Sequence, residues 1–250
     1  MLTEERHRTI LNLLEDKDIV KIQEIVDATD ASESTIRRDL TQLEQEKYLK
    51  RVHGGASKLQ GKLQELSVSE KSTKNLQEKH LIAQYAASLV EEGDCIFLDA
   101  GTTTLNMIDH LKEKAVVIVT NGLTHIDCLL EKGLKTYTIG GYVKPITKAM
   151  IGRGAVESLR EYRFDKAFIG MNGIHPQYGF TTPDPEEAQV KKIAMELSRE
   201  AIVLADDTKF GEIAFSKVAN LDEAMIITNS LDENYATTFA EKTTIKVVTT

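Results

Sequence analysis

The stretch from residue 32 to residue 56, SESTIRRDLTQLEQEKYLKRVHGGA, constrains the fold of this chain more than any other stretch. Ser32 predicts the start of a helix, because a serine hydroxyl readily accepts a backbone N–H of the first turn. Three apolar residues follow at the i, i+4 and i+7 spacing of one helix face: Ile36, Leu40 and Leu43. Residues 48–52 then predict a strand, and Gly54-Gly55 predicts a tight turn, since glycine adopts positive φ at no steric cost.

Basic and hydroxyl side chains gather at the start of this helix and on the hairpin. Residues 47–64 contain five Lys or Arg and no Asp or Glu. In a helix-turn-helix, the reading helix presents its first residues to base edges and phosphates. A basic hairpin beside it suggests the wing of a winged helix. The residues expected to contact DNA are Ser32, Ser34, Thr35, Arg37, Arg38, Lys50, Arg51 and His53. The alternative is an ordinary amphipathic helix with a solvated charged face, which the pair Arg37-Arg38 alone would favour.

The charge balance requires any contact with DNA to be local. The formal net charge of the 250-residue chain is −8, and residues 1–60 contain ten Lys or Arg against twelve Asp or Glu. A chain this acidic is not expected to coat nucleic acid in general. The positive charge clustered at the helix start and on the hairpin is the kind of footprint that specific DNA binding needs.

Other sequence signals predict a cytoplasmic protein without a metal or cofactor. The N-terminus MLTEERHR lacks the apolar core of a signal peptide, and no apolar run approaches the length of a membrane span. Cys95 and Cys128 are isolated in apolar segments and predict small core residues. The six His residues show no i, i+4 pairing and none adjoins a Cys, so we expect no metal site.

The order of elements predicts two domains of different kinds. Residues 1–58 predict three short helices, a hairpin and a short strand at residues 19–20 that pairs with the wing, which is a winged helix-turn-helix. Residues 59–75 are polar and predict a linker. From residue 76 to residue 250, short apolar strands alternate with helices. This alternation predicts an α/β domain with a Rossmann-like, mainly parallel sheet and helices on both faces.

The loops that follow the predicted strands share one composition. In an open parallel sheet these loops meet beyond the carboxyl ends of the strands, where ligands bind. They are rich in Gly, Thr, Asn and Asp, over residues 99–104, 120–122, 140–142, 170–173 and 206–211. Glycine lets a ligand approach the backbone, Thr and Asn supply neutral hydrogen bonds, Asp accepts from hydroxyls, and Lys attracts an anion. The loops together predict a pocket for a small polyol that carries a negative group.

The loop Gly101-Thr102-Thr103-Thr104 predicts the position of a phosphate. It opens a helix, and free backbone N–H groups at a helix start favour an anion. A plain N-cap by Thr102 or Thr103 is an equal alternative. No Gly-Lys-Ser/Thr follows, so the loop is not a P-loop, and Gly152-x-Gly154 lacks the third glycine of a dinucleotide fingerprint.

A set of titratable residues is compatible with acid–base chemistry on a sugar phosphate. These residues are Glu186, Glu187, Lys191, Asp206, Asp207 and Lys209. The alternative is structural: Glu186 and Glu187 stabilise the dipole of the helix that they start, and Lys191 pairs with Glu187 four residues earlier. Because a DNA-binding module precedes this domain, we expect binding without turnover.

Several of these pieces, in order along nearly the whole chain, resemble the DeoR family of bacterial transcriptional regulators. They are STIRRDL at 34–40, RVHGGA at 51–56, DAGTT at 99–103, TN at 120–121, GG at 140–141, and the segments 165–173 and 206–211. The first two motifs are the most specific. The resemblance implies an N-terminal winged helix-turn-helix and a C-terminal domain similar to ribose-5-phosphate isomerases, which senses a phosphorylated sugar.

The resemblance also implies which residues bind the effector. By carry-over they are Asp99, Gly101, Thr102, Thr103, Asn121, Gly141, Asp206 and Lys209, and the argument from the residues adds Thr104 and Lys191. Within the family, the chain looks most like repressors of fructose operons, which respond to fructose 1-phosphate. Lactose phosphotransferase repressors, which respond to tagatose 6-phosphate, are close behind.

The expected protein is therefore a repressor with two partners, double-stranded operator DNA and a phosphorylated sugar, and it acts as a homodimer or homotetramer. An activator would share every feature. The alternative from another class is a sugar-phosphate isomerase or deaminase with a fused accessory module. In that case the catalytic candidates are Asp99, Glu187, Asp206 and Lys209.

Overall fold

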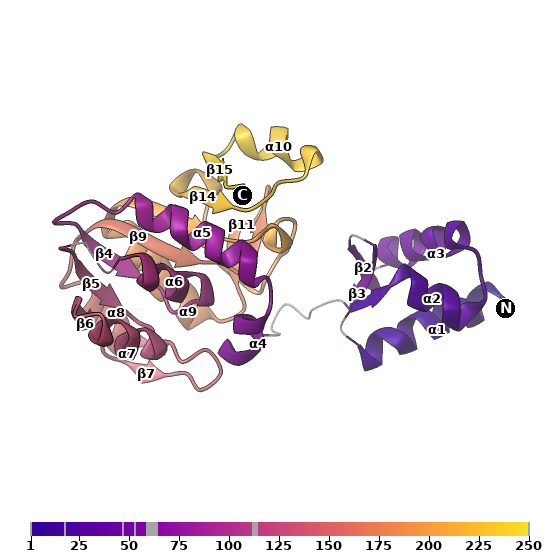
Figure 1. Ribbon diagram of the computed structural model, residues 1–250, viewed down its shortest axis with the longest axis horizontal. Coiled ribbons are helices and arrows are strands. Elements are labelled where there is room, and N and C mark those ends of the chain that lie inside the picture. The colour runs from indigo at the N-terminus through magenta and orange to yellow at the C-terminus, as the bar shows by residue number, and fades with distance from the viewer. Residues whose placement is uncertain are drawn as a thin grey trace. The chain divides into compact units, whose positions relative to one another are not determined.

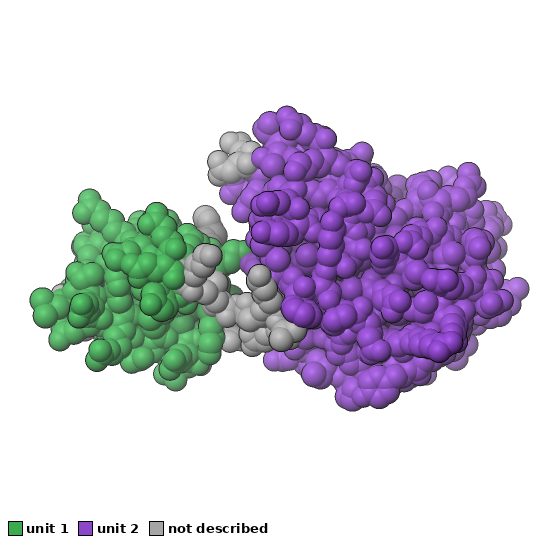
Figure 2. All heavy atoms as spheres, turned by 180° about the vertical axis from the view of Figure 1, so that it is seen from behind, with its two compact units in different colours: residues 1–61 green, residues 62–250 purple. Residues whose placement is uncertain are grey.

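A computed structural model describes residues 2–17, 19–46, 48–52, 54–58, 65–111 and 115–249. The chain divides into two compact units, Met1–Gly61 and Lys62–Thr250, which Figure 2 colours separately. The division falls inside residues 59–75, the segment expected as a linker.

The described part of the first unit holds three helices around a small antiparallel sheet (Figure 1). The helices are α1 (Thr3–Asp16), α2 (Ile22–Thr29) and α3 (Glu33–Gln45). The strands are β1 (Ile19–Lys21), β2 (Leu49–Val52) and β3 (Gly55–Lys58), in the order β1-β3-β2. The predicted winged helix-turn-helix is confirmed, including the short strand that pairs with the wing.

The wing requires two glycines for two different reasons. Gly54 has a φ of 76°, which L-residues with a side chain rarely adopt. Gly55 lies beside β1, and a Cβ at this position would lie 2.1 Å from the backbone oxygen of Val20. The first glycine therefore satisfies the dihedral angle of the turn, and the second permits the close approach of two strands.

Helix α3 is positioned by its cap, its apolar face and one carboxylate. The Ser32 hydroxyl accepts a hydrogen bond from the Thr35 amide at 3.3 Å, as expected for an N-cap. The predicted apolar face is fully covered, at Ile36, Leu40 and Leu43. Asp39 is 5% exposed, and its two oxygens accept hydrogen bonds from the Arg6 guanidinium at 2.7 and 3.0 Å. Asp39 thus joins α3 to α1.

We expect Asp39→Asn to lower the free energy of unfolding of the first unit by about 2–3 kcal/mol, because it leaves the Arg6 charge without its buried partner. The measurement is native-state hydrogen exchange of the α1 and α3 amides in the full chain. Glu33→Gln is the control, since the exposed Glu33–Arg37 pair contributes at most about 0.5 kcal/mol. Equal protection in the two variants would contradict this role of Asp39.

The second unit is built on a seven-stranded sheet in which every pair of neighbouring strands is parallel. The strand order is β15-β14-β12-β9-β4-β5-β6. The strands are β4 (Cys95–Leu98), β5 (Val117–Thr120), β6 (Lys135–Thr138), β9 (Phe164–Gly170), β12 (Ser198–Leu204), β14 (Met225–Thr228) and β15 (Ile245–Val247). The predicted parallel α/β domain is confirmed, and all carboxyl ends of these strands lie at one edge.

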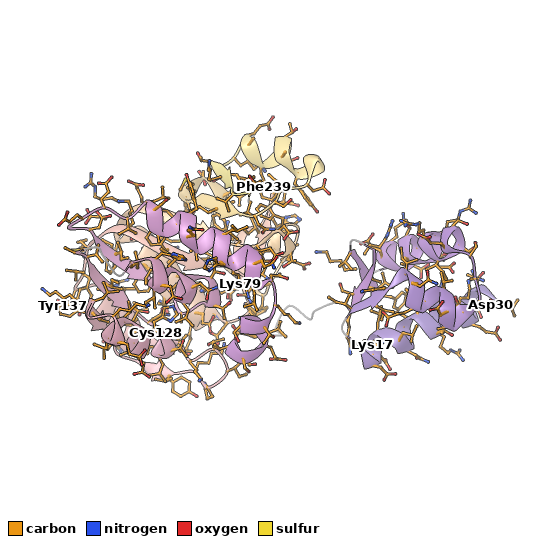
Figure 3. The ribbon with its side chains drawn as sticks, viewed as in Figure 1. Lys17, Asp30, Lys79, Cys128, Tyr137 and Phe239 are labelled. Carbon is orange, nitrogen blue, oxygen red and sulfur yellow. The ribbon has the colours of Figure 1, made fainter. Side chains whose placement is uncertain are left out.

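Helices cover both faces of this sheet (Figure 1). On one face pack α5 (Leu76–Ser88) and α6 (Thr102–Met107), and on the other pack α8 (Arg153–Leu159) and α9 (Pro185–Glu196). The remaining helices are α7 (Leu123–Glu131), α10 (Glu233–Ala240) and the 3-10 turns η1 (Ile108–His110), η2 (Asp207–Lys209) and η3 (Leu221–Glu223). Phe239 of α10, labelled in Figure 3, packs edge-on against Phe210. Among the described residues, no helix has the length and apolar character needed to cross a membrane.

The sequence interpretation missed the antiparallel parts of this unit. These are β10 (Gly173–His175), β11 (Gly179–Thr182) and β13 (Ser216–Ala219), which form one small sheet, and the hairpin of β7 (Tyr142–Val143) and β8 (Met150–Ile151). Each strand has only two to four residues, and β11 reads GFTT, so its full burial leaves no alternation in the sequence.

The last part of the expected linker is helical and belongs to the second unit. Helix α4 (Val68–Thr73) is capped by Ser67, which exchanges hydrogen bonds with Glu70. The Val68 amide donates to the carbonyl oxygen of Ile146 at 3.1 Å. Lys79 on α5, labelled in Figure 3, donates from its ammonium to the carbonyl oxygens of Lys71 and Lys74, at the end of α4. Residues 59–64 lie outside the described residues.

Candidate functional site

The start of α3 carries a group of hydroxyls and two exposed arginines. The Ser32 hydroxyl lies 3.0 Å from that of Ser34 and 2.9 Å from that of Thr35, so the three predicted hydroxyls form one cluster. Arg37 is held by Glu33 one turn earlier, at 2.5 Å. Arg38 is exposed and makes no ion pair or hydrogen bond with any residue in the described part of the chain. Arg38 can therefore approach an anion without first breaking an ion pair or hydrogen bond to a described residue.

The wing residues are tied to the same helix. The Arg51 amide donates to the Glu44 carboxylate at 2.7 Å, and its guanidinium donates to the Thr41 hydroxyl at 3.0 Å. Arg51 thus fixes the wing against α3, and Lys50 precedes it on β2. His53, predicted to contact DNA, lies outside the described residues.

In the second unit, Asp99 connects several elements at the carboxyl edge of the sheet. It follows β4 directly and is 1% exposed. Its Oδ2 accepts a hydrogen bond from the Gly170 amide at 3.0 Å and contacts the ammonium of Lys191. Lys191 also donates to the Gly170 carbonyl oxygen at 3.1 Å. The three residues join the ends of β4 and β9 to α9.

Lys191 therefore pairs with Asp99, and the expected pairing with Glu187 four residues earlier is wrong. Burial lowers the pKa of Lys191, but the charges of Asp99 and Glu187 outweigh it and raise the pKa above its ordinary value. The Glu187 carboxylate instead accepts hydrogen bonds from the Thr147 hydroxyl at 2.6 Å and from the Lys144 ammonium at 3.3 Å. Helix α9 is capped by Asp184.

The side chains of Thr104 and Asn121 fix the loop after β4 by hydrogen bonds to its backbone. The Thr104 hydroxyl is fully buried, lies 2.5 Å from the Asp99 carbonyl oxygen, and contacts His125 Nε2 at 3.1 Å. The Asn121 side chain accepts a hydrogen bond from the Ala100 amide at 2.8 Å. The Thr104 hydroxyl is thus occupied within the loop, which favours a structural role over direct contact with a ligand.

The other predicted members of this loop are better placed for a ligand. The Thr103 side chain is 8% exposed, and its hydroxyl makes no hydrogen bond with another described residue. Thr102 and Gly101 are half-buried beside it. Gly141 lies in another loop, the one after β6. It has a φ of 117°, and a Cβ there would lie 2.5 Å from the Ile151 carbonyl oxygen, so packing within the second unit already requires this glycine.

The loop after β12 adds a buried carboxylate and a partly exposed cation. Asp206 is 2% exposed and accepts a hydrogen bond from the Thr208 amide at 3.1 Å. The Lys209 ammonium lies 3.9 Å from Asp206 and donates to the Thr208 hydroxyl at 3.1 Å. Because its side chain is 34% exposed, Lys209 can approach an anion without breaking a buried pair. Asp207 instead bonds to Asn229.

Sequence reasoning missed two lysines that complete this edge. The pKa of Lys71 on α4 is lowered, mainly by burial. The charges of Glu65 and Glu187 oppose this shift, and the charges of Lys191 and Lys209 add to it. The ammonium of Lys71 is thus in the electrostatic neighbourhood of both predicted effector lysines. Lys144 contacts Glu65, Asp184 and Glu187. Neither residue lies in a motif, and Lys71 falls in the expected linker, so no sequence signal identified them.

His125 gives the sheet edge a dependence on pH. Burial lowers its pKa to about 4. The unfolded chain therefore takes up a proton near pH 6.5 and the folded chain does not, so stability is constant above this value and falls between pH 6.5 and 4. We expect about 1–2 kcal/mol of unfolding free energy to be lost from His125 between pH 7 and pH 5.

The measurement is urea unfolding of the full chain at pH 7 and pH 5, followed by far-ultraviolet circular dichroism. His125→Gln keeps a polar side chain that does not titrate, and its stability should decline less than that of the wild type. An equal decline in both proteins would contradict a neutral, buried His125.

Comparison with known proteins identifies both units. Residues 6–61 match the DeoR-like helix-turn-helix domain, and residues 74–230 match the DeoR C-terminal sensor domain. The chain belongs to the DeoR family. It is 54% identical over 249 residues, 99% of either chain, to an uncharacterized HTH-type transcriptional regulator of Bacillus subtilis, FruR. It is 35% identical, over 98% of either chain, to a lactose phosphotransferase system repressor of Staphylococcus aureus.

The resemblance to DeoR regulators is thereby confirmed, and the family resolves the choice between regulator and enzyme. The two relatives above, which align along nearly the whole chain, are named as a transcriptional regulator and a repressor, so the family favours a regulator over an enzyme. Ribose 5-phosphate isomerase of Methanocaldococcus jannaschii is also similar, with 21% identity over 55% of each chain and a TM-score of 0.42. This likeness concerns the fold and carries no information on activity.

Proposed function

We propose that this DeoR-family protein represses a sugar-utilisation operon and that a phosphorylated sugar releases it from the operator. The observation that carries the proposal is the pairing of two sites in one chain. An exposed, unpaired arginine lies at the start of a reading helix, and a parallel sheet edge gathers lysines around hydroxyls and glycines. The name of the Staphylococcus aureus relative, a lactose phosphotransferase system repressor, supports repression of a sugar operon.

DNA binding is proposed to use the start of α3 and the wing. A dimer would present two reading helices about 34 Å apart, which is one turn of DNA. Arg38 and Arg37 reach bases or phosphates, the hydroxyls of Ser34 and Thr35 add neutral contacts, and Lys50 contacts the backbone.

We expect Arg38→Ala to weaken operator binding. If Arg38 contacts a base, the loss should be about 1–3 kcal/mol and specific to the operator sequence; if it contacts a phosphate, affinity should fall by a similar factor for every DNA sequence. Arg37→Ala should have a smaller effect, because Arg37 must first leave Glu33. The measurement is a gel-shift titration with the promoter fragment of the neighbouring operon. Arg8→Ala removes the same charge from an exposed position on α1 and is the control. Unchanged titrations for both arginine variants of α3 would remove the DNA-binding proposal.

The effector is proposed to bind at the sheet edge, with its hydroxyls near Asp206 and Asn121 and its phosphate near Thr103 and Lys209. The higher identity to FruR than to the lactose repressor favours fructose 1-phosphate, and tagatose 6-phosphate is the second candidate. A ligand changes operator affinity only through different affinities for the two arrangements of the DNA-binding units.

We expect Lys209→Ala and Thr103→Ala to bind operator normally but to need at least about tenfold more sugar phosphate for release, since each loses a phosphate contact of about 1.4 kcal/mol or more. The measurement is release of labelled operator by fructose 1-phosphate and, separately, by tagatose 6-phosphate. Lys192→Ala, one residue beyond the buried Lys191 but exposed, is the control. Release at the same concentration for all four proteins would place the effector elsewhere.

A further inference from the structure

Glu65 is a buried carboxylate in the segment that connects the two units. Its side chain is only 6% exposed. Its Oε2 contacts the Lys144 ammonium, and its Oε1 lies 3.7 Å from the Lys71 ammonium. Within the described residues, nothing donates a hydrogen bond to Oε1. A buried carboxylate oxygen without a hydrogen bond is costly, so Glu65 is held here by charge and not by a complete set of donors.

Lys144, which contacts Glu65, is shared among three carboxylates. Lys144 also contacts Asp184 at 2.7 Å and Glu187 at 3.3 Å. Burial lowers the pKa of Lys144, but hydrogen bonds from its ammonium to Asp184 and Glu65 raise it well above its ordinary value. The Lys144 ammonium therefore contacts three carboxylates, and the Lys71 ammonium lies close to one of them, Glu65.

The three carboxylates differ in how they are anchored. Asp184 accepts hydrogen bonds from the first amides of α9, and Glu187 lies within α9 and accepts from Thr147. Glu65 lies outside any helix, seven positions after Lys58, where the wing strand β3 ends. Of the three, Glu65 is the carboxylate whose departure disturbs the second unit least and the connection to the first unit most.

This group adjoins the proposed effector site. The charge of Glu65 raises the pKa of Lys191, the partner of Asp99, and Lys71 is in the neighbourhood of Lys191 and Lys209. Helix α4, which carries Lys71, packs against α6, which begins at Thr102. An anion that enters beside Lys209 is therefore also attracted by Lys71, one of the two lysines that hold Glu65.

We propose that Lys144 and Lys71 form an anion-binding pair that Glu65 occupies and that the phosphate of a phosphorylated sugar, bound beside Lys209, takes over. The inference rests on the proposed function, and it names the contact through which the effector acts. A phosphate carries up to two negative charges, so its arrival beside three carboxylates expels the one that can leave. Loss of Glu65 from Lys144 loosens the attachment of residues 65–73 to the second unit and so alters the placement of the DNA-binding units.

The test uses the full chain and two matched variants. Glu65→Gln removes the competing charge, so the effector no longer has to displace it, and we expect fructose 1-phosphate to bind at least about fivefold more tightly. Glu70→Gln removes the same charge from α4, where glutamine still completes the cap, and should bind like the wild type. Isothermal titration calorimetry measures all three, with unphosphorylated fructose as a second ligand that should not distinguish them.

Equal affinity of Glu65→Gln and wild type for fructose 1-phosphate would overturn the exchange at Lys144 and leave the proposed function standing. Tighter binding of unphosphorylated fructose by Glu65→Gln would also overturn it, because the phosphate would not be the competing group. Failure of the wild type to bind any phosphorylated sugar would instead overturn the proposed function itself.

Hydrogen exchange of the wild type provides a readout that needs no variant. The amides of residues 68–73 should exchange several-fold faster when fructose 1-phosphate is bound, since α4 loses the contact of Lys71 with Glu65 and keeps only part of its hold through Lys79 and Ile146. In Glu65→Gln the same amides should exchange fast without ligand. Unchanged or slower exchange of α4 in the liganded wild type would overturn the inference.

Discussion

The sheet edge of the second unit depends on one buried ion pair, that between Asp99 and Lys191. Asp99 directly follows β4, which lies next to the central strand β9, and Lys191 projects from α9, which covers the opposite face to α5 and α6. Both charges are almost fully buried, and removing one partner of such a pair costs about 3–5 kcal/mol because the other remains unpaired. The pair also engages the Gly170 backbone on both its N–H and its C=O, so the ends of β4 and β9 and the helix α9 meet at one point. The Thr103 hydroxyl and the partly exposed Lys209 lie in loops that follow strands of the same sheet edge.

This arrangement suits recognition better than chemistry. The buried carboxylates and lysines that would serve as acids and bases are engaged with one another or with backbone groups. The Thr103 hydroxyl and the Lys209 ammonium, which is partly exposed and only loosely paired with Asp206, are groups suited to hold a ligand without reacting with it. The family relationship and the geometry therefore agree on a sensor built on a fold that elsewhere also carries enzymes.

Much of the fold could be predicted from the sequence because its signals are local. The apolar spacing of Ile36, Leu40 and Leu43 and the short apolar strands each reflect burial that repeats along the chain. The site was predictable only as a set of loops, since parallel strands bring their carboxyl ends together. The ion pairs within the site could not be predicted. Lys191 pairs with Asp99, which is 92 positions away in the sequence, and not with Glu187, which is one helix turn away. The role of Lys71 was hidden because a helix of six residues, with no buried side chain of its own, leaves no periodic signal.

The ion pair between Glu33 and Arg37 has a consequence for how this protein responds to salt. A lysine or arginine that reaches DNA from bulk solvent displaces a condensed counterion, and the slope of log affinity against log salt counts such events. Arg37 already carries its own counter-charge on the same helix, one turn away. If Arg37 engages the duplex as proposed, Glu33 is left facing the phosphates, and cations are retained there to balance it. The number of released ions is then smaller than the number of arginine contacts, and a salt titration underestimates how much of the reading helix touches DNA.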